Sequence, residues 1–353
     1  MNTLKVSLLA LLIISSVQDT LANPLVEEPL KKGISAIVAQ KVDQGINQMS
    51  ELAKNYPNFK LAQYVKADLL SYRSGQHFNK NNKNVILSTD VYNELEARLK
   101  DDDVVKKNLY PSEIVYLGQQ YPHVLVADIS KSRLYVYNNK LALVNSFYMS
   151  VGRGGAGKEK VNDGKTPLGT YFIDKRIDGE SLPDKYGDAA YPLNYPNAWD
   201  KIKGKTGYGI WLHGTAKASY SRVPNATEGC ISLANDDLKA IERYITENTP
   251  IIIGNPVKWS NNRVAFNNPD FLKEFKVLNK ENYTVTTTDT KPNVSVVATT
   301  GKESFTNLSL INGPENEMMV ATFLQQQEDK VTRVEQYWKN TPTGWEVISE
   351  TGI

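Results

Sequence analysis

The 353-residue sequence has little of the chemistry that several function classes need, because it contains one cysteine and three histidines. One cysteine cannot form a disulfide within the chain, and three histidines without paired spacing do not form a zinc site, which needs three or four clustered ligands. The formal net charge is +2 and no long basic run occurs. These absences exclude a disulfide scaffold and give no basis for binding a metal ion or nucleic acid.

Long hydrophobic runs are also missing. The main apolar run extends from Val6 to about Val17, follows Lys5, and precedes the small-residue site Thr20-Leu21-Ala22. A membrane-spanning helix needs about 20 apolar residues, so this shorter run is typical of a secretory signal peptide. We expect residues 1–22 to be removed and the mature chain to begin near Asn23. The mature protein is then exported, without stable membrane insertion.

Export affects the interpretation of the single thiol, Cys230. Outside the cytoplasm a free thiol tends to be oxidised unless it is protected or used. Cys230 can therefore be a small buried hydrophobic residue or a reactive nucleophile. Export and cysteine count alone leave both interpretations open.

The first part of the mature chain, residues 23–110, has a helical pattern. Apolar residues recur at three- and four-residue spacing from Ile34 to Leu52, and again from Leu61 to Leu70, with a break at 55–58. This predicts two helices that resemble one tetratricopeptide-like hairpin, although no second copy follows at the required period. We interpret the region as a packing element.

The next part, residues 120–255, changes to short runs rich in Val, Leu and Tyr separated by polar turns. This texture predicts a largely antiparallel β-rich domain. One helix is predicted in it, from Asp236 to Ile245, with Asn235 or Asp236 as its cap.

The last part, residues 265–353, begins with a helix candidate at Asn268 and ends with three alternating strands. The final strands resemble the closing strands of nuclear transport factor two-like (SnoaL-like) domains. We expect a small α+β domain with a helix on a curved antiparallel sheet. The whole chain is thus predicted to be α+β and mainly β.

The segment from Trp211 to Asn235 carries the chemistry. A cysteine acyl-transfer enzyme needs a thiolate, a base and donors for the developing oxyanion. His213 can take the proton of Cys230 or hold the thiolate as an ion pair. The Gly214 carbonyl can orient the far imidazole nitrogen, as an acid does in a serine triad. Gly229 permits a close turn, so the amides of Gly229 and Cys230 can converge on an oxyanion.

Several motifs then give a family resemblance. The chain has His-Gly-Thr at 213–215, Thr-Glu-Gly-Cys-Ile at 227–231, Asp-Gly-Lys-Thr-Pro-Leu-Gly at 163–169, a strand end at 150–152 and a Tyr-rich strand from Arg133. In this order they resemble the L,D-transpeptidase (YkuD-type) catalytic domain. Two positions depart from the family pattern: Glu228, where His is common, and Ser232, where Arg is frequent. These departures bear on substrate binding and oxyanion contacts.

The resemblance implies a reaction on peptidoglycan tetrapeptide stems. Cys230 would attack the carbonyl on the L-centre of the third residue, and D-alanine would leave with a proton from His213. Water would resolve the thioester in an L,D-carboxypeptidase, and a stem amine would resolve it in an L,D-transpeptidase. The resemblance implies a periplasmic enzyme without a cofactor. The combination of this domain with the predicted C-terminal domain resembles the branch that includes L,D-carboxypeptidases of helical and curved bacteria.

Further residues are candidates for substrate binding. The hydroxyls of Thr215 and Thr227 lie close to the pair in sequence, and can bond either the loop or the substrate. The rings of Tyr195, Tyr208 and Trp211 can line a donor groove or pack internally.

Other residues of the sequence suggest alternative functions. Residues 152–158 match part of a nucleotide-binding P-loop, but Glu159 stands where Ser or Thr must hold magnesium. A sortase-like site would pair the thiol with an arginine such as Arg222. The alternative to an enzyme is a binding module, a non-catalytic scaffold that binds the cell wall.

Overall fold

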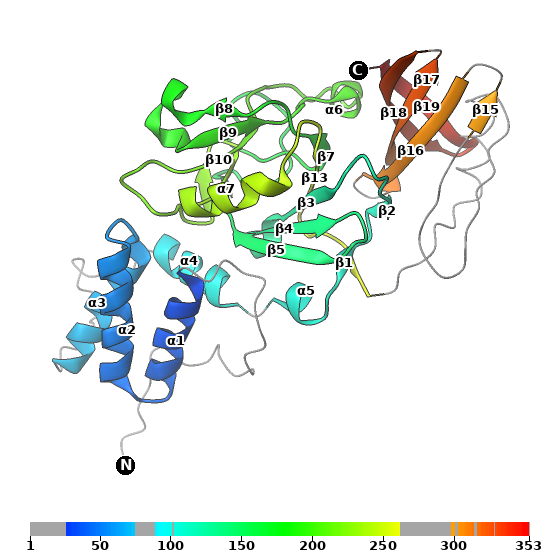
Figure 1. Cartoon of the computed structure of the whole chain (residues 1–353). Helices are drawn as coiled ribbons and strands as arrows, with labels where there is room; N and C mark the ends of the chain where they lie inside the picture. The colour runs from blue at the N-terminus through cyan, green and yellow to red at the C-terminus, as the bar shows by residue number, and fades with distance from the viewer. Residues whose placement is uncertain are drawn as a thin grey trace.

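The computed structural model describes residues 26–74, 89–100, 102–261, 298–300, 303–313, 316–327 and 329–352. Figure 1 shows a helical region at one end, a β-rich domain in the middle and a C-terminal sheet at the other end. The predicted signal peptide (1–22) and the helix candidate at Asn268 lie outside the described residues. The fold class, α+β and mainly β, is confirmed.

The helical region differs from the prediction in one respect. Its helices are α1 (Glu27–Val38), α2 (Val42–Asn55), α3 (Lys60–Arg73), α4 (Thr89–Leu99) and α5 (Asp103–Lys106). The pattern predicted one helix over 34–52, but the chain turns at Gln40, whose φ is +62°. The turn folds α1 against α2, and Gly45 has room only for a hydrogen beside Ile37, because an added Cβ would lie 2.6 Å from it. Both helices thereby bury their apolar faces in one cluster.

Two sheets sandwich the core of the middle domain. The first has the order β5-β4-β3-β13-β7, and the second has the order β12-β10-β9-β8. The strands of the first sheet are β3 (His123–Asp128), β4 (Arg133–Asn138), β5 (Leu143–Tyr148), β7 (Gly169–Phe172) and β13 (Pro250–Gly254). Those of the second are β8 (Ile177–Asp178), β9 (Ala189–Pro192), β10 (Trp211–His213) and β12 (Ile231–Ser232). The buried cluster between them draws on both sheets.

Parallel pairs make this domain less antiparallel than expected. β13 runs parallel to β3, β12 runs parallel to β10, and β6 (Val151–Gly152) runs parallel to β11 (Asn225–Thr227). The predicted helix after the cysteine segment is α7 (Asn235–Ile241), continued by a 3₁₀ turn to Tyr244. A short helix that was not predicted, α6 (Ala198–Ile202), begins at a capping box of Asn197 and Asp200.

The C-terminal sheet is antiparallel throughout. Its strands are β15 (Ala298–Thr300), β16 (Glu303–Asn312), β17 (Met318–Gln327), β18 (Lys330–Thr341) and β19 (Gly344–Gly352). The last three are the predicted strands. The segment before the middle domain forms two pairings. β2 (Ile114–Tyr116) pairs with β16 of the C-terminal sheet. β1 (Tyr110–Pro111) pairs with β14 (Trp259–Ser260), which follows the middle domain. The likeness to a nuclear transport factor two-like domain stays a prediction.

Candidate active site

Strand pairing brings together the two segments that carry His213 and Cys230. In the parallel pair of β10 with β12, Leu212 lies opposite Ile231 and His213 lies opposite Ser232. Side chains alternate along a strand, so Leu212 and Ile231 enter the core, where both are fully buried, and His213 takes the other face. Cys230 directly precedes β12, so its segment lies next to the strand that ends at His213.

The imidazole of His213 is held in one orientation. Its Nδ1 lies 2.6 Å from the carbonyl oxygen of Gly214, which also accepts a hydrogen bond of 2.8 Å from the Ser232 hydroxyl. A carbonyl only accepts, so Nδ1 carries the proton and Nε2 keeps its lone pair. Burial lowers the pKa of His213 to about 4, against a smaller opposing effect of the Gly214 hydrogen bond. At neutral pH the ring is an uncharged base.

The thiol of Cys230 is also uncharged at neutral pH. Only 9% of the residue is exposed, and Sγ donates to the Gly209 carbonyl over 3.3 Å. Burial raises the pKa of the thiol, and the Trp211 backbone N–H and nearby cations offset only part of this effect. Of the two roles predicted for His213, general base and ion-pair partner, the resting structure supports the first.

A tight turn presents the cysteine. The Thr227 hydroxyl donates to the Cys230 carbonyl (2.7 Å) and accepts from the Gly229 N–H (3.1 Å). Gly229 has a φ of +127°, and an added Cβ would lie 2.7 Å from the Lys165 carbonyl oxygen. Only glycine fits this position.

Thr166 joins the other motifs to the turn. Its hydroxyl donates to the Gly229 carbonyl (3.0 Å) and accepts from the Gly152 N–H (2.9 Å). The strand end at 150–152 and the Thr-Pro motif are thereby linked to the turn that carries Cys230.

One of the two predicted oxyanion donors has an internal partner at rest. The Gly229 N–H donates to the Thr227 hydroxyl over 3.1 Å, which closes the turn. A buried amide without a partner is costly, so the turn favours this hydrogen bond. The roles of the Gly229 and Cys230 amides as oxyanion donors stay predictions.

Several predicted substrate contacts are internal contacts in the structure. The Thr227 hydroxyl bonds the cysteine turn, and the Tyr195 hydroxyl donates to the Thr206 carbonyl (3.0 Å) with the ring packed on Tyr171. Thr215 is 1% exposed, and its hydroxyl has no partner among the described residues. In the structure these side chains make internal contacts or are buried, and their roles in substrate binding stay predictions.

The two remaining candidates lie nearer the surface. Tyr208 is 82% exposed, and Trp211 is half-buried with its ring 4.8 Å from that of Tyr186. Tyr186 in turn meets the His213 ring edge-on at 5.1 Å. Sequence patterns missed Tyr186, because it lies in a short 3₁₀ turn (Asp184–Tyr186) that carries no motif.

Asn235 was also missed as a site residue, since it was interpreted as a helix cap. Its side chain instead accepts from the Thr215 N–H (3.1 Å) and donates to the Thr215 carbonyl (2.8 Å). Helix α7 begins at Asn235 without a side-chain cap. Asn235 thus fixes the backbone directly after His213 and Gly214.

The loop that links His213 to Cys230 rests on the helical region. The Tyr220 ring lies 5.2 Å from Tyr56 and 4.9 Å from Phe59, and its N–H donates to the Asn58 carbonyl. The Ser221 hydroxyl donates to Glu94 of α4 over 2.7 Å. The turn between α2 and α3 and the helix α4 therefore help to shape the loop.

The structure contradicts a P-loop at residues 152–158. Lys158 is 3% exposed and its Nζ pairs with Asp163 at 2.9 Å, so it is not available to a phosphate. Asp163 also accepts N–H bonds from Glu159, Lys160 and Lys165. The loop is organised by this carboxylate.

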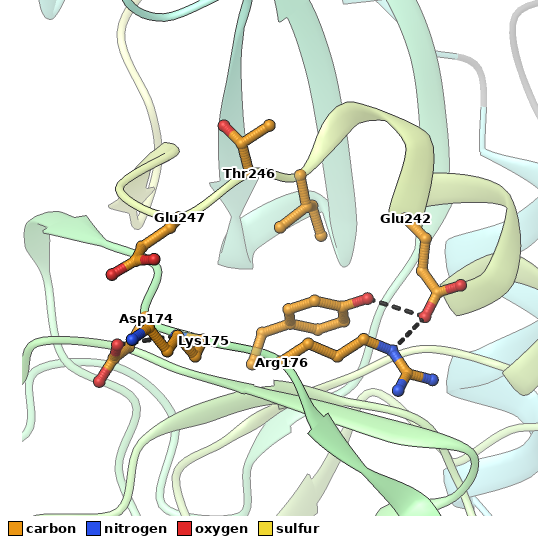
Figure 2. Close-up of a pocket in the computed structure, with 8 residues that line it drawn as sticks. Asp174, Lys175, Arg176, Glu242, Thr246 and Glu247 are labelled. Carbon is orange, nitrogen blue, oxygen red and sulfur yellow. Dashed lines mark hydrogen bonds and ion pairs between the residues drawn. The ribbon is translucent and has the colours of Figure 1, made fainter.

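A separate cavity of about 330 Å³ lies away from the catalytic pair. Figure 2 shows Glu242 at its edge, bonded to Arg176 and to a tyrosine, which is Tyr191. Tyr191 lies opposite Leu212 in the sheet, so it projects from the face opposite to His213. Its lining offers no nucleophile, and we assign it no part in the reaction.

The described ranges contain neither a metal-binding cluster nor a membrane-spanning helix. No group of three or more His, Cys, Asp or Glu side chains gathers there as a metal site would require. Among the same residues, no helix is both long and apolar enough to cross a membrane.

A buried thiol beside an oriented neutral imidazole has the parts of a cysteine acyl-transfer site. Residues 122–253 match the family model of the L,D-transpeptidase catalytic domain, so the chain contains a domain of this type. No curated protein matches the chain by sequence.

One solved structure shares the fold, and two others are similar to parts of the chain. Bd1075 of Bdellovibrio bacteriovorus is 21% identical, with a TM-score of 0.52 over 69% of this chain and 98% of its own. The helical cell shape determining protein Pgp2 of Campylobacter jejuni is 19% identical, with a TM-score of 0.47 over 69% and 93%. An L,D-transpeptidase of Mycobacterium smegmatis is 18% identical, with a TM-score of 0.26 over 38% and 58%.

Proposed function

We propose that the protein cleaves the L,D bond of peptidoglycan tetrapeptide stems through a Cys230 thioester and releases D-alanine. The observation that carries the proposal is the hydrogen bond from His213 Nδ1 to the Gly214 carbonyl. It leaves Nε2 as an uncharged base, and the pairing of β10 with β12 brings the segments that carry His213 and Cys230 side by side. The match to the catalytic domain family supplies the substrate class.

The first half of the reaction transfers the acyl group to sulfur. Because thiol and imidazole are both neutral at rest, the proton moves from Sγ to Nε2 as sulfur attacks the carbonyl carbon. The Cys230 amide stabilises the oxyanion. The intermediate then collapses, the C–N bond breaks, and His213 gives its proton to the amine of the departing D-alanine.

The second half depends on the acceptor. Water, deprotonated by His213, yields a tripeptide and makes the enzyme an L,D-carboxypeptidase. The amine of a neighbouring stem yields a 3-3 crosslink and makes it an L,D-transpeptidase. Both acceptors regenerate the thiol and need no cofactor. We place the activity in the periplasm, where the predicted export would deliver the enzyme and where stems are accessible, with control of cell shape as its biological role.

Mass spectrometry of the products tests this function. The mature protein is incubated with a disaccharide tetrapeptide: loss of one alanine with gain of water indicates the carboxypeptidase, and a dimer indicates the transpeptidase. Cys230→Ser should abolish either product while the melting temperature stays close to that of the wild type. If the wild type forms no product yet binds cell-wall sacculi as well as Cys230→Ser does, the protein is a non-catalytic scaffold.

A further inference from the structure

Two cationic side chains lie beside the catalytic pair and have no role in the chemistry described so far. Lys185 directly precedes Tyr186, whose ring meets His213. The Nη2 group of Arg222 donates to the Lys185 carbonyl over 2.8 Å. Behind the larger effects of burial and of backbone hydrogen bonds, the charges of Arg222 and Lys185 also lower the pKa values of His213 and Cys230. Both cations are therefore close to the reacting groups.

Both cations keep unused capacity for an anion. Among the described residues, no carboxylate pairs with Arg222, and its buried Nε donates to no partner. Lys185 has Glu228 at 3.8 Å, but the two side chains are 53% and 73% exposed. Exposed pairs at that separation contribute little, so Lys185 can exchange this partner for a ligand.

The backbone of Arg222 is fixed from several sides. The Tyr148 hydroxyl donates to the Arg222 carbonyl over 2.9 Å. The two preceding residues, Tyr220 and Ser221, are anchored on the helical region. A cation on a fixed backbone binds its ligand with less loss of conformational freedom. The planar guanidinium also matches a carboxylate better than an ammonium does.

The leaving group of the proposed reaction supplies a matching anion. One residue spans about 3.5 Å of extended chain, so the terminal carboxylate of a tetrapeptide lies that far beyond the scissile carbonyl. We propose that Arg222 and Lys185 form a subsite for this terminal α-carboxylate, a proposal that rests on the proposed function. Arg222 is the main anchor and Lys185 assists. The subsite selects stems that end one residue past the scissile bond and rejects stems extended by a further residue.

The test compares two donors that differ in one group. A tetrapeptide stem with a free terminal carboxylate and the same stem with a terminal carboxamide are given to the mature protein, and kcat/KM for release of the last residue is measured. A charged hydrogen bond predicts a preference of about 10- to 100-fold for the acid. Arg222→Gln should lower kcat/KM for the acid by that factor and leave the amide unchanged. Lys185→Gln should act in the same direction to a smaller extent.

Lys217→Ala is the matched control, because it removes an exposed cation from the same loop. It should change neither donor. Equal losses for acid and amide in Arg222→Gln would show a structural role and overturn the proposal. Arg222→Lys guards against misfolding, and should recover part of the preference for the acid.

Two further arms separate the explanations. The same pair of stems with L-lysine as the third residue removes the side-chain carboxylate of a diaminopimelate. If Arg222→Gln erases only the preference between these third residues, the anchored group is that side chain and the assignment to the terminal carboxylate is wrong. Binding of acid and amide to Cys230→Ser, measured by calorimetry, tests the subsite without turnover. A wild type that binds the acid more tightly but releases nothing would refute the proposed function and leave the subsite in place.

Discussion

The helical region and the C-terminal sheet both pack on the catalytic domain, but they touch different parts of it. The helices contact the loop between His213 and Cys230 through Tyr220 and Ser221. The C-terminal sheet shares a buried cluster with Tyr121 and Phe172 on the side of the first sheet. Figure 1 shows the two regions at opposite ends. The helical region therefore supports the loop between His213 and Cys230, whereas the C-terminal sheet supports the first sheet of the catalytic domain.

The chemistry of the two interfaces also differs. At the helical interface, Glu27 and Glu94 pair with Arg98 and Arg133, and all four side chains are nearly fully buried. At the C-terminal interface the main cluster is apolar, and Tyr121 donates to Thr322 over 3.1 Å and accepts from Arg333 over 3.0 Å. A buried charge that loses its partner stays uncompensated, whereas an apolar cluster that loses a side chain is left with a cavity.

The largest expected effect is on Glu27. Glu27→Gln leaves Arg98 and Arg133 buried with Glu94 alone, which should lower the free energy of unfolding by about 3–5 kcal/mol. Chemical denaturation measures it. Asp43→Asn removes an exposed pair with Arg73 and should cost less than about 1 kcal/mol. If both variants lose the same stability, the buried network is not what joins the regions.

Tyr220 offers a direct comparison between the interfaces. Tyr220→Ala and Tyr121→Ala each remove a buried ring and should each cost about 3 kcal/mol. Only Tyr220→Ala should also lower kcat/KM for D-alanine release, by roughly 10-fold or more, because the catalytic loop loses its anchor. Both are assayed well below their melting temperatures.

Tyr220→Phe is the matched control. The Tyr220 hydroxyl is buried without a partner among the described residues, so its removal should leave stability and kcat/KM close to wild type. If Tyr121→Ala lowers kcat/KM as much as Tyr220→Ala does, the helical region has no special role in supporting the loop between His213 and Cys230.

The pH dependence of stability reports on the reacting side of the domain. Burial lowers the pKa of His213 from 6.5 to about 4. As pH falls from 6.5 to 4, His213 becomes protonated in the unfolded chain but stays neutral in the folded protein. The free energy of unfolding therefore falls by up to about 3 kcal/mol and then levels off. The difference between wild type and His213→Gln in denaturation at pH 4, 5, 6 and 7 isolates this contribution. A constant difference over this range would mean that His213 titrates normally.

The smallest effect is expected at Thr215. Its hydroxyl is buried and has no partner among the described residues, so Thr215→Val should change stability by less than about 1 kcal/mol. The original expectation of substrate binding by Thr215 predicts instead a lower kcat/KM. Unchanged melting with reduced kcat/KM would restore that role.

The structure shows the predicted contact of His213 Nδ1 with the Gly214 carbonyl, whereas the catalytic roles of Cys230 and His213 stay predictions. Cys230, His213 and Gly214 stood out because acyl transfer needs a nucleophile, a base and an orienting group, and the motif places all of them in one segment. The break between α1 and α2 was missed, since a continuous apolar period extends across Gln40. Lys185, Tyr186 and the true contact of Asn235 were missed because their partners are distant in sequence.

What the sequence determined by itself is the set of chemical groups and the strands that carry them. Local residue order decides which side chains alternate on a strand and which contacts close a tight turn, as in the hydrogen bond from Gly229 to Thr227. The tertiary structure alone decided that the Lys165 carbonyl leaves room only for glycine at Gly229, that burial keeps both His213 and Cys230 neutral, and that the helices contact Tyr220. Hydrogen-bond direction and desolvation depend on neighbours from other elements, which no local pattern specifies.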